Sequence, residues 1–187
     1  MTNRYSFVGS DQGPWQVTDM RTIFGESLAP ARRVSVVNNV VAELPANSVW
    51  MLQSVVSNIR YSKRDELTML RAVQPALNRS EALCAVLIPI KKTAQWWDLA
   101  QDERRAIFEE QSHHTAVGME YLPEVARRLH HCRDLGEPFD FLTWFEFAPE
   151  HAQAFKDLLQ RMRASKEWDY VEREVEVWLH RAPEQGL

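Results

Sequence analysis

Two adjacent histidines in the stretch EEQSHHTAVGMEYLPEVARR are the first candidates for metal chemistry in this chain. His114 stands 13 residues before Arg127, the first residue of an arginine pair. Neighbouring residues on a helix point about 100° apart, so His113 and His114 cannot bind one small ion in the way an HExxH pair does. Neither HExxH nor a Cys/His zinc spacing occurs anywhere in the chain. A metal centre at this pair would therefore use a single imidazole.

Haem is such a centre, because the porphyrin supplies four nitrogens and the protein adds one imidazole beside an apolar slot. On the helix expected here, His114 is in line with Ile107 and Val117, and this apolar stripe is suited to line the slot. His113 is displaced toward the acidic pair at 109–110, the more solvated side. On pattern alone, a solvent-facing histidine pair on a helix remains the favoured interpretation, since one histidine is no signature.

The other histidines offer a weaker metal hypothesis. His130 and Cys132 share one face of an expected strand, and His131 points to the other face. A tetrahedral zinc site from His130, Cys132 and a distant partner is conceivable, although such sites usually contain local ligand pairs. Cys84 and Cys132 lie in apolar stretches without CxxC spacing, so free buried thiols are the better interpretation.

Composition narrows the class of protein. With 187 residues the chain can form one well-buried core or one fold of two similar halves. The net charge of −4 argues against a nucleic-acid partner. Among the cations, 17 are arginine and 5 are lysine, and arginine suits planar anions. The start MTNRYSFVGS resembles no secretory signal, and no apolar run is long enough to span a membrane, so we expect a soluble cytoplasmic protein without a membrane partner.

The elements that must position these residues follow from apolar periodicity. Residues 1–48 are irregular by pattern, with SDQGPWQ and LPANS as turns or linkers. We expect strands at 49–61, 81–90, 139–147 and 168–180, and helices at 63–78, 102–119 and 149–165. Thr93 is the expected cap of a first linking helix, Pro149 opens the last helix, and Pro123 ends the helix that carries the histidines. The stretch RRLHHCRDLGEPFDF is expected to form a hairpin through its Gly-Pro turn.

The order strand–helix–strand occurs twice, which indicates a single α+β domain over residues 1–187. We expect two ferredoxin-like units, at about 49–90 and 127–180, joined by linking helices at 91–123. A strand such as 139–147, which is apolar on both faces, implies a sheet that is covered on both sides.

Five motifs occur in one order along the chain: WW, ERR.IFE..SHH, YLP..AR, HCRD.GEPFDFLTWFE.APEH and EW.YVEREV. With their spacing, the chain resembles the chlorite dismutase family over about residues 50–180, most densely over 88–180. More narrowly it is similar to the short-chain branch, whose members are dimers. The resemblance implies a dimeric α/β-barrel type of domain, haem b as cofactor and a homodimer.

The resemblance also implies roles for single residues. His114 matches the axial ligand of the haem iron, and Glu167 matches the carboxylate that binds the other ring nitrogen. Lys92 matches a residue of the same network. Arg127 matches a mobile arginine on the opposite side of the haem, and Gln74 the residue that can hold it there. Residues expected beside the haem or its propionates are Trp96, Trp97, Ile88, Leu122, Phe141, Asn58 and Tyr61.

Ordinary structural roles stand beside several of these assignments. Trp96 and Trp97 would bury a large area in any fold. Lys92 suits a solvated strand end, and Gln74 the surface of a helix. Lys91 stands where arginine is expected, which keeps the charge but not a bidentate contact. Arg128, the second arginine, is expected to remain at the surface.

The activity implied by the resemblance is that of a chlorite O₂-lyase, which converts chlorite to chloride and dioxygen through ferryl and hypochlorite intermediates. Arg127 is the expected catalytic residue and chlorite the small anionic partner. Relatives include haem peroxidases and coproporphyrin-haem decarboxylases. The decarboxylases lack the arginine above the haem, so Arg127 favours chlorite chemistry. A non-enzymatic haem-binding protein is the alternative from another functional class.

Overall fold

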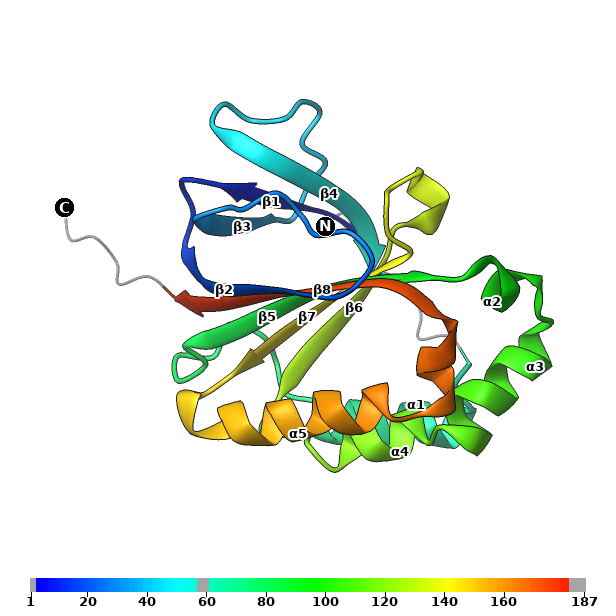
Figure 1. Cartoon of the computed structure of the whole chain (residues 1–187). Helices are drawn as coiled ribbons and strands as arrows, with labels where there is room; N and C mark the ends of the chain where they lie inside the picture. The colour runs from blue at the N-terminus through cyan, green and yellow to red at the C-terminus, as the bar shows by residue number, and fades with distance from the viewer. Residues whose placement is uncertain (1–2, 57–60, 182–187) are drawn as a thin grey trace.

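Eight antiparallel strands form a closed barrel in the computed structural model, which describes residues 3–56 and 61–181 (Figure 1). Around the barrel the strands follow the order β1-β3-β2-β8-β5-β7-β6-β4. Their bounds are β1 Arg4–Ser10, β2 Trp15–Phe24, β3 Arg33–Val37, β4 Ser48–Val56, β5 Cys84–Lys92, β6 Ala126–His131, β7 Phe141–Phe147 and β8 Val171–Arg181. Closure leaves no unpaired edge, so the sheet has an inner and an outer face.

The helices lie together on one side of the barrel (Figure 1). They are α1 Arg64–Val73, α2 Ala94–Asp98, α3 Gln101–Arg105, α4 His114–Met119 and α5 Ala152–Arg163. A π-helical segment, Ala106–Gln111, continues α3, and short 3₁₀ helices occupy Arg133–Leu135, Pro149–His151 and Lys166–Tyr170. Among the described residues, no helix is long and apolar enough to cross a membrane.

Two hydrophobic cores explain why the strands under the helices are apolar on both faces. Leu87 and Leu142 point into the barrel, where side chains from all around the sheet fill the first core. Ile88 and Phe145 point outward and pack in the second core with residues of α5, such as Phe155. The prediction of a sheet covered on both sides is therefore confirmed for β5 and β7.

Most of the predicted elements are confirmed, including the hairpin of β6 and β7 and the Thr93 cap, whose side chain accepts from the Trp96 N–H. The expectation of an irregular segment at 1–48 is wrong, because β1, β2 and β3 lie there. These strands are short or carry polar side chains, and β2 pairs with β8 at the other end of the chain. The mixed α/β class is confirmed, while the two ferredoxin-like units and their boundaries stay a prediction.

The continuous helix predicted for 102–119 is wrong. Its middle is the π-helical segment, and His113 then adopts a left-handed backbone conformation with φ of 53° before α4 begins at His114. Because a π turn contains more residues than an α turn, side chains beyond it are rotated away from their α-helical positions. Phe108, within the π-helical segment, and Gly118, beyond it, line the same cavity as His114, in place of Ile107 and Val117.

Candidate functional site

A cavity lies between the outer face of β5, β6 and β7 and the helical layer. We call it the outer cavity. It holds about 1110 Å³ of space free of protein atoms, including an open mouth, and most of its wall is apolar. Its lining residues are Tyr61, Ile88, Ile90, Lys92, Trp96, Phe108, His114, Gly118, Tyr121, Leu122, Val125, Arg127, Leu129, His131, Phe141, Thr143, Phe145, Leu158, Leu159, Met162, Glu167, Trp168 and Glu174.

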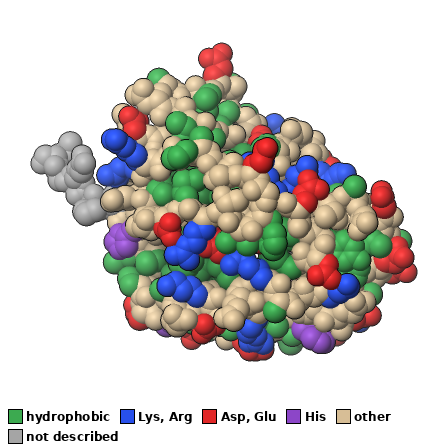
Figure 2. Space-filling model, viewed as in Figure 1, with side chains coloured by type: hydrophobic (Ala, Val, Ile, Leu, Met, Phe, Trp, Pro, Cys, Tyr) green, Lys and Arg blue, Asp and Glu red, His purple; other side chains and the backbone are tan. Residues whose placement is uncertain are grey.

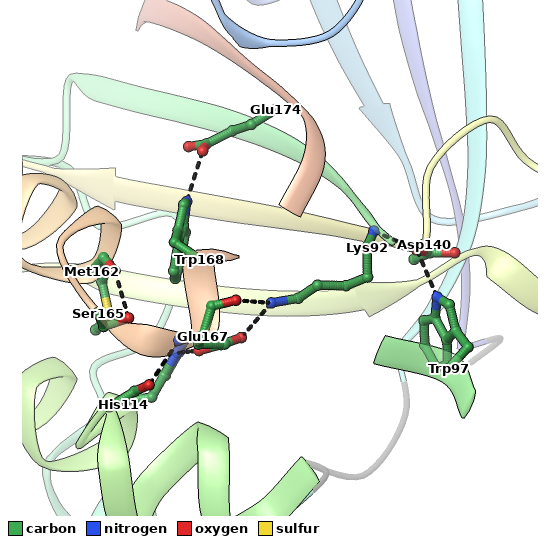
Figure 3. Close-up of polar contacts among 10 residues, drawn as sticks. Lys92, Trp97, His114, Asp140, Met162, Ser165, Glu167, Trp168 and Glu174 are labelled. Atoms are coloured by element: carbon green, nitrogen blue, oxygen red, sulfur yellow. Dashed lines mark hydrogen bonds and ion pairs between the residues drawn. The ribbon is translucent and has the colours of Figure 1, made fainter. Parts of the chain in front are cut away.

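His114 enters the outer cavity from the first residue of α4, and its ring is fixed by Glu167 (Figure 3). The Nδ1 atom of His114 lies 2.6 Å from Oε2 of Glu167. The second carboxylate oxygen, Oε1, accepts from Nζ of Lys92 at 2.8 Å. The backbone N–H of Glu167 donates to Oγ of Ser112, at 2.9 Å, which anchors the backbone that carries this carboxylate. Since Nδ1 is used, Nε2 is the ring nitrogen that remains for a ligand.

The charge state of Glu167 follows from its neighbours. Burial alone would raise the pKa of this carboxyl, but the positive charges of Lys92 and His114 and the hydrogen bonds from both lower its pKa to about 2. Glu167 is therefore an anion throughout the neutral range and acts as the hydrogen-bond acceptor for His114. Lys92 is equally buried, so each member of this ion pair depends on the other.

Aromatic rings hold the two partners of Glu167 in place. The ring of Phe108 stacks on His114, with 4.4 Å between ring centroids and an angle of 23°. Nζ of Lys92 lies 4.6 Å from the ring centroid of Trp96 and 5.5 Å from that of Trp168. The sequence pattern missed Phe108, Trp168 and Ser112. Ser112 had a possible signal, because serine is common just before a helix start.

Arg127 reaches the outer cavity from β6, on the sheet side. Within the described part of the chain, its guanidinium makes no hydrogen bond or ion pair. Burial lowers the pKa of Arg127 below its usual range, and the negative charge of Glu167 opposes this effect. A cation in an apolar wall without a counter-ion is suited to attract a small anion. The side chain of Gln74 donates to the backbone carbonyl of Arg127 at 2.6 Å, so its contact with the guanidinium stays a prediction.

Of the remaining residues expected around a haem, Trp96, Ile88, Leu122, Phe141 and Tyr61 line the outer cavity. Trp97 does not line it. Its indole N–H donates to Asp140 at 3.1 Å, and its ring stacks on the cavity residue Phe141. Asn58 lies outside the described residues. Lys91 is exposed and pairs with Glu172 at 2.6 Å, which accounts for its charge without a ligand.

The histidines of β6 divide between the two faces of the sheet. His131 faces the outer cavity, whereas His130 points into the barrel and shares a hydrogen bond of 3.1 Å with Ser54. The Cys132 thiol donates to the carbonyl of Phe139, and both cysteines are free. In the described ranges, no three His, Cys, Asp or Glu side chains are grouped to hold a metal ion. Arg128 also lies half-buried toward the barrel interior, so its predicted surface position is wrong.

The outer cavity fits a haem in three respects. It offers the free Nε2 of His114 beside an apolar wall. At Gly118 the wall is bare backbone. The space in front of it is open, since a Cβ added there would meet no atom closer than Cε of Met162, at 3.9 Å. The hydroxyl of Tyr61 and the indole nitrogen of Trp96 are buried without a hydrogen-bond partner among the described residues. Both are donors that could meet the carboxylates of a porphyrin.

The fold and this site define an α/β barrel protein with a histidine–carboxylate pair in an outer cavity. The family model described as chlorite dismutase matches residues 31–182. The chain therefore belongs to the chlorite dismutase family.

Individual relatives agree with this assignment. A dimeric chlorite dismutase from Nitrobacter winogradskyi is 50% identical in sequence, with a TM-score of 0.89 over 95% of this chain and 99% of that one. A mutant chlorite dismutase from Candidatus Nitrospira defluvii is 19% identical, with a TM-score of 0.71 over 98% and 93%, and shows the same fold. A chlorite dismutase from Ideonella dechloratans is 39% identical over 62 residues, a match that spans 20% of that relative's length.

The ion pair between Glu167 and Lys92 is expected to make the free energy of unfolding depend on pH. A pKa of about 2, against 4.5 for an ordinary glutamate, corresponds to about 3 kcal/mol of folding free energy. Because the folded-state pKa is the lower one, this stabilisation is complete above about pH 4.5 and is lost as the pH falls toward 2. The E167Q variant leaves Lys92 buried and unpaired, so we expect it to be less stable by about 3–5 kcal/mol at pH 7.

Urea unfolding of the haem-free chain between pH 7 and pH 3 measures this effect. The difference between wild type and E167Q should narrow as the pH falls below 4.5. The double variant K92M/E167Q is the matched control, since it removes the unpaired ammonium and should recover much of the lost stability. A difference that is constant with pH would contradict the lowered pKa.

Proposed function

We propose that the outer cavity binds haem b through Nε2 of His114 and that the protein decomposes chlorite to chloride and dioxygen. The observation that carries this proposal is one cavity that contains both the hydrogen-bonded set His114–Glu167–Lys92 and Arg127, whose guanidinium has no partner among the described residues. Family membership supports the reaction, and the proximity of cation and ligand supports the site. The bound haem would supply an open iron position that accepts oxygen from chlorite.

Glu167 and Lys92 would act on the haem side of the site. By accepting the Nδ1–H of His114, the Glu167 carboxylate makes the imidazole more anionic and therefore a stronger electron donor. Lys92 keeps this carboxylate ionised and limits how much negative charge it transfers. Phe108 fixes the plane of the imidazole by stacking on it.

Arg127 would act on the substrate side. Its guanidinium can attract chlorite and hydrogen-bond to it, and a charged hydrogen bond contributes about 1.5–3 kcal/mol. When chlorite has lost one oxygen, the hypochlorite that remains is again an anion, and the same guanidinium can hold it until the O–O bond forms. The apolar residues around it exclude water and reductants that would divert the reaction.

An oxygen electrode tests the proposed function. Haem-loaded wild-type protein given chlorite is expected to release one dioxygen and one chloride for each chlorite consumed, as the balance of atoms requires. Full haem loading without oxygen release would overturn the enzyme proposal and favour a non-enzymatic haem-binding protein. Peroxide-dependent oxidation of a dye, without oxygen from chlorite, would favour a peroxidase. Loss of the propionate carboxyls under peroxide would indicate a decarboxylase.

We also propose that the chain forms a homodimer. The support is the 50% identity with the Nitrobacter winogradskyi protein, which is described as dimeric, across nearly all of both chains. Sedimentation velocity distinguishes a dimer from a pentamer or a monomer. Acidic and basic side chains are interleaved on the face that the space-filling view shows (Figure 2).

A further inference from the structure

A second cavity, which we call the barrel cavity, lies at one end of the barrel interior. It holds about 1160 Å³ of free space including its mouth, close to the value for the outer cavity. The sheet separates the two cavities, because side chains alternate along a strand. On β6, Arg127 faces the outer cavity and Arg128 faces the barrel cavity. On β7, Phe145 faces the outer cavity and Trp144 faces the barrel cavity.

Two arginines in the barrel cavity carry charge that the described residues do not pair. The guanidinium carbon of Arg181 lies 4.8 Å from the ring centroid of Trp15, and its Nε and Nη2 atoms are buried without a hydrogen-bond partner in the described ranges. The guanidinium carbon of Arg128 lies 5.2 Å from the ring centroid of Tyr5, and the ion pairs of the described residues do not include it. In both arginines an aromatic ring covers the face of the guanidinium, while the N–H edge stays available to donate hydrogen bonds to a ligand.

The other ionisable groups of the barrel cavity do not neutralise this charge. Glu146 uses both carboxylate oxygens within the protein, since one accepts the Asn78 N–H at 2.6 Å and the other the Trp144 indole N–H at 2.8 Å. No ion pair within the described residues joins Glu146 to an arginine. His130 is neutral at pH 7, because burial and the nearby Arg128 lower its pKa to about 3. Among the described lining residues, the two cations Arg128 and Arg181 against the single carboxylate of Glu146 leave an excess of one positive charge.

An excess positive charge in a partly apolar cavity favours the binding of an anion. Buried N–H donors without partners are costly, and a ligand that accepts from them recovers that cost. The planar N–H edge of arginine suits carboxylates, with which it forms two parallel hydrogen bonds. Trp15 and Trp144 meet edge to face at 5.4 Å, so the wall beside Arg181 is aromatic. Such a wall favours a flat apolar body attached to the anionic group.

We propose that the barrel cavity is a second ligand site, which binds a small aromatic carboxylate. The carboxylate accepts from the free edge of Arg181, Arg128 adds a second positive charge, and the ring of the ligand packs against Trp15 and Trp144. The site is independent of the proposed haem chemistry, since the wall of the sheet lies between the two cavities.

Calorimetric titration of the haem-loaded protein with benzoate tests this site. We expect benzoate to bind wild type and the R181Q variant to bind it at least about 10-fold more weakly, the loss of one charged hydrogen bond. Benzyl alcohol, which has the same ring without the charge, should bind weakly to both. The matched control is R127Q, which removes a guanidinium from the other face of the sheet and should change benzoate affinity less than about 2-fold.

Several results would overturn the proposal. Loss of benzoate binding in R127Q but not in R181Q would place the anion in the outer cavity. Nitrate that binds as tightly as benzoate would show that the aromatic wall has no role. Dissociation of the oligomer by R128Q or R181Q, without benzoate binding to wild type, would assign both arginines to a subunit interface. If R181Q does not fold, the benzoate affinities of R181K and R128Q are compared with that of wild type instead. The unfolding temperature and the haem absorbance of each variant check that it is folded.

Discussion

The H114A variant is expected to lose stable haem binding and, with it, oxygen release from chlorite. His114 is the ring whose Nδ1 is held 2.6 Å from the Glu167 carboxylate, so its Nε2 is presented to the outer cavity in one orientation. Loss of groups that merely orient a metal ligand costs 10- to 100-fold in affinity, so loss of the ligand itself should cost about 100-fold or more. Titration of the haem-free chain with haemin, followed by the Soret absorbance, measures the change.

The neighbouring histidine provides the matched control for this experiment. His113 is exposed and adopts a left-handed backbone conformation just before α4. H113A should therefore bind haem as wild type does. Added imidazole should restore part of the Soret signal of H114A, because it can occupy the space of the missing ring. Loss of haem in H113A with retention in H114A would assign the ligand to the other histidine and contradict the site described above.

Local patterns predicted the parts of this fold that depend on near neighbours in sequence. The hairpin of β6 and β7 contains its own Gly-Pro turn, and α5 carries its own apolar stripe, so both were visible without tertiary information. The strands β1, β2 and β3 were missed for the opposite reason. Their pairing partners include β4 and β8, and the closure of the barrel, rather than periodicity within 1–48, stabilises them.

The site residues that could be predicted are those whose side-chain chemistry defines their role. Residues that belong to the site only because of the local backbone geometry were harder to predict. The resemblance named His114 and Glu167, which lie 53 positions apart in sequence and meet in the structure. It did not name Phe108, which lies in the π-helical segment and stacks on His114. The period of an α-helix does not place these two residues on one face. Strand alternation alone predicts that Arg128 faces away from Arg127, but only a closed sheet turns that opposite face into a barrel interior.

Replacing Arg127 by alanine is expected to leave haem binding intact but to impair the retention of hypochlorite. Arg127 lines the outer cavity from β6, whereas the ligand and its partners come from other elements, so haem loading does not depend on it. Without the guanidinium, substrate attraction and retention each lose a charged hydrogen bond of about 1.5–3 kcal/mol, or roughly 10- to 150-fold in the corresponding equilibrium. The oxygen yield per chlorite should fall, and the haem should bleach after fewer turnovers.

A hypochlorite trap and a lysine variant make this prediction specific to Arg127. Monochlorodimedone added during turnover should be chlorinated much more by R127A than by wild type, because hypochlorite then leaves the cavity before dioxygen forms. R127K is the matched control. It keeps the charge without the planar N–H edge, so chlorite attraction should largely survive while retention falls between the other two proteins. If R127A gave a wild-type oxygen yield with no chlorinated trap, retention would depend on another residue of the cavity, and the role proposed for Arg127 would be wrong.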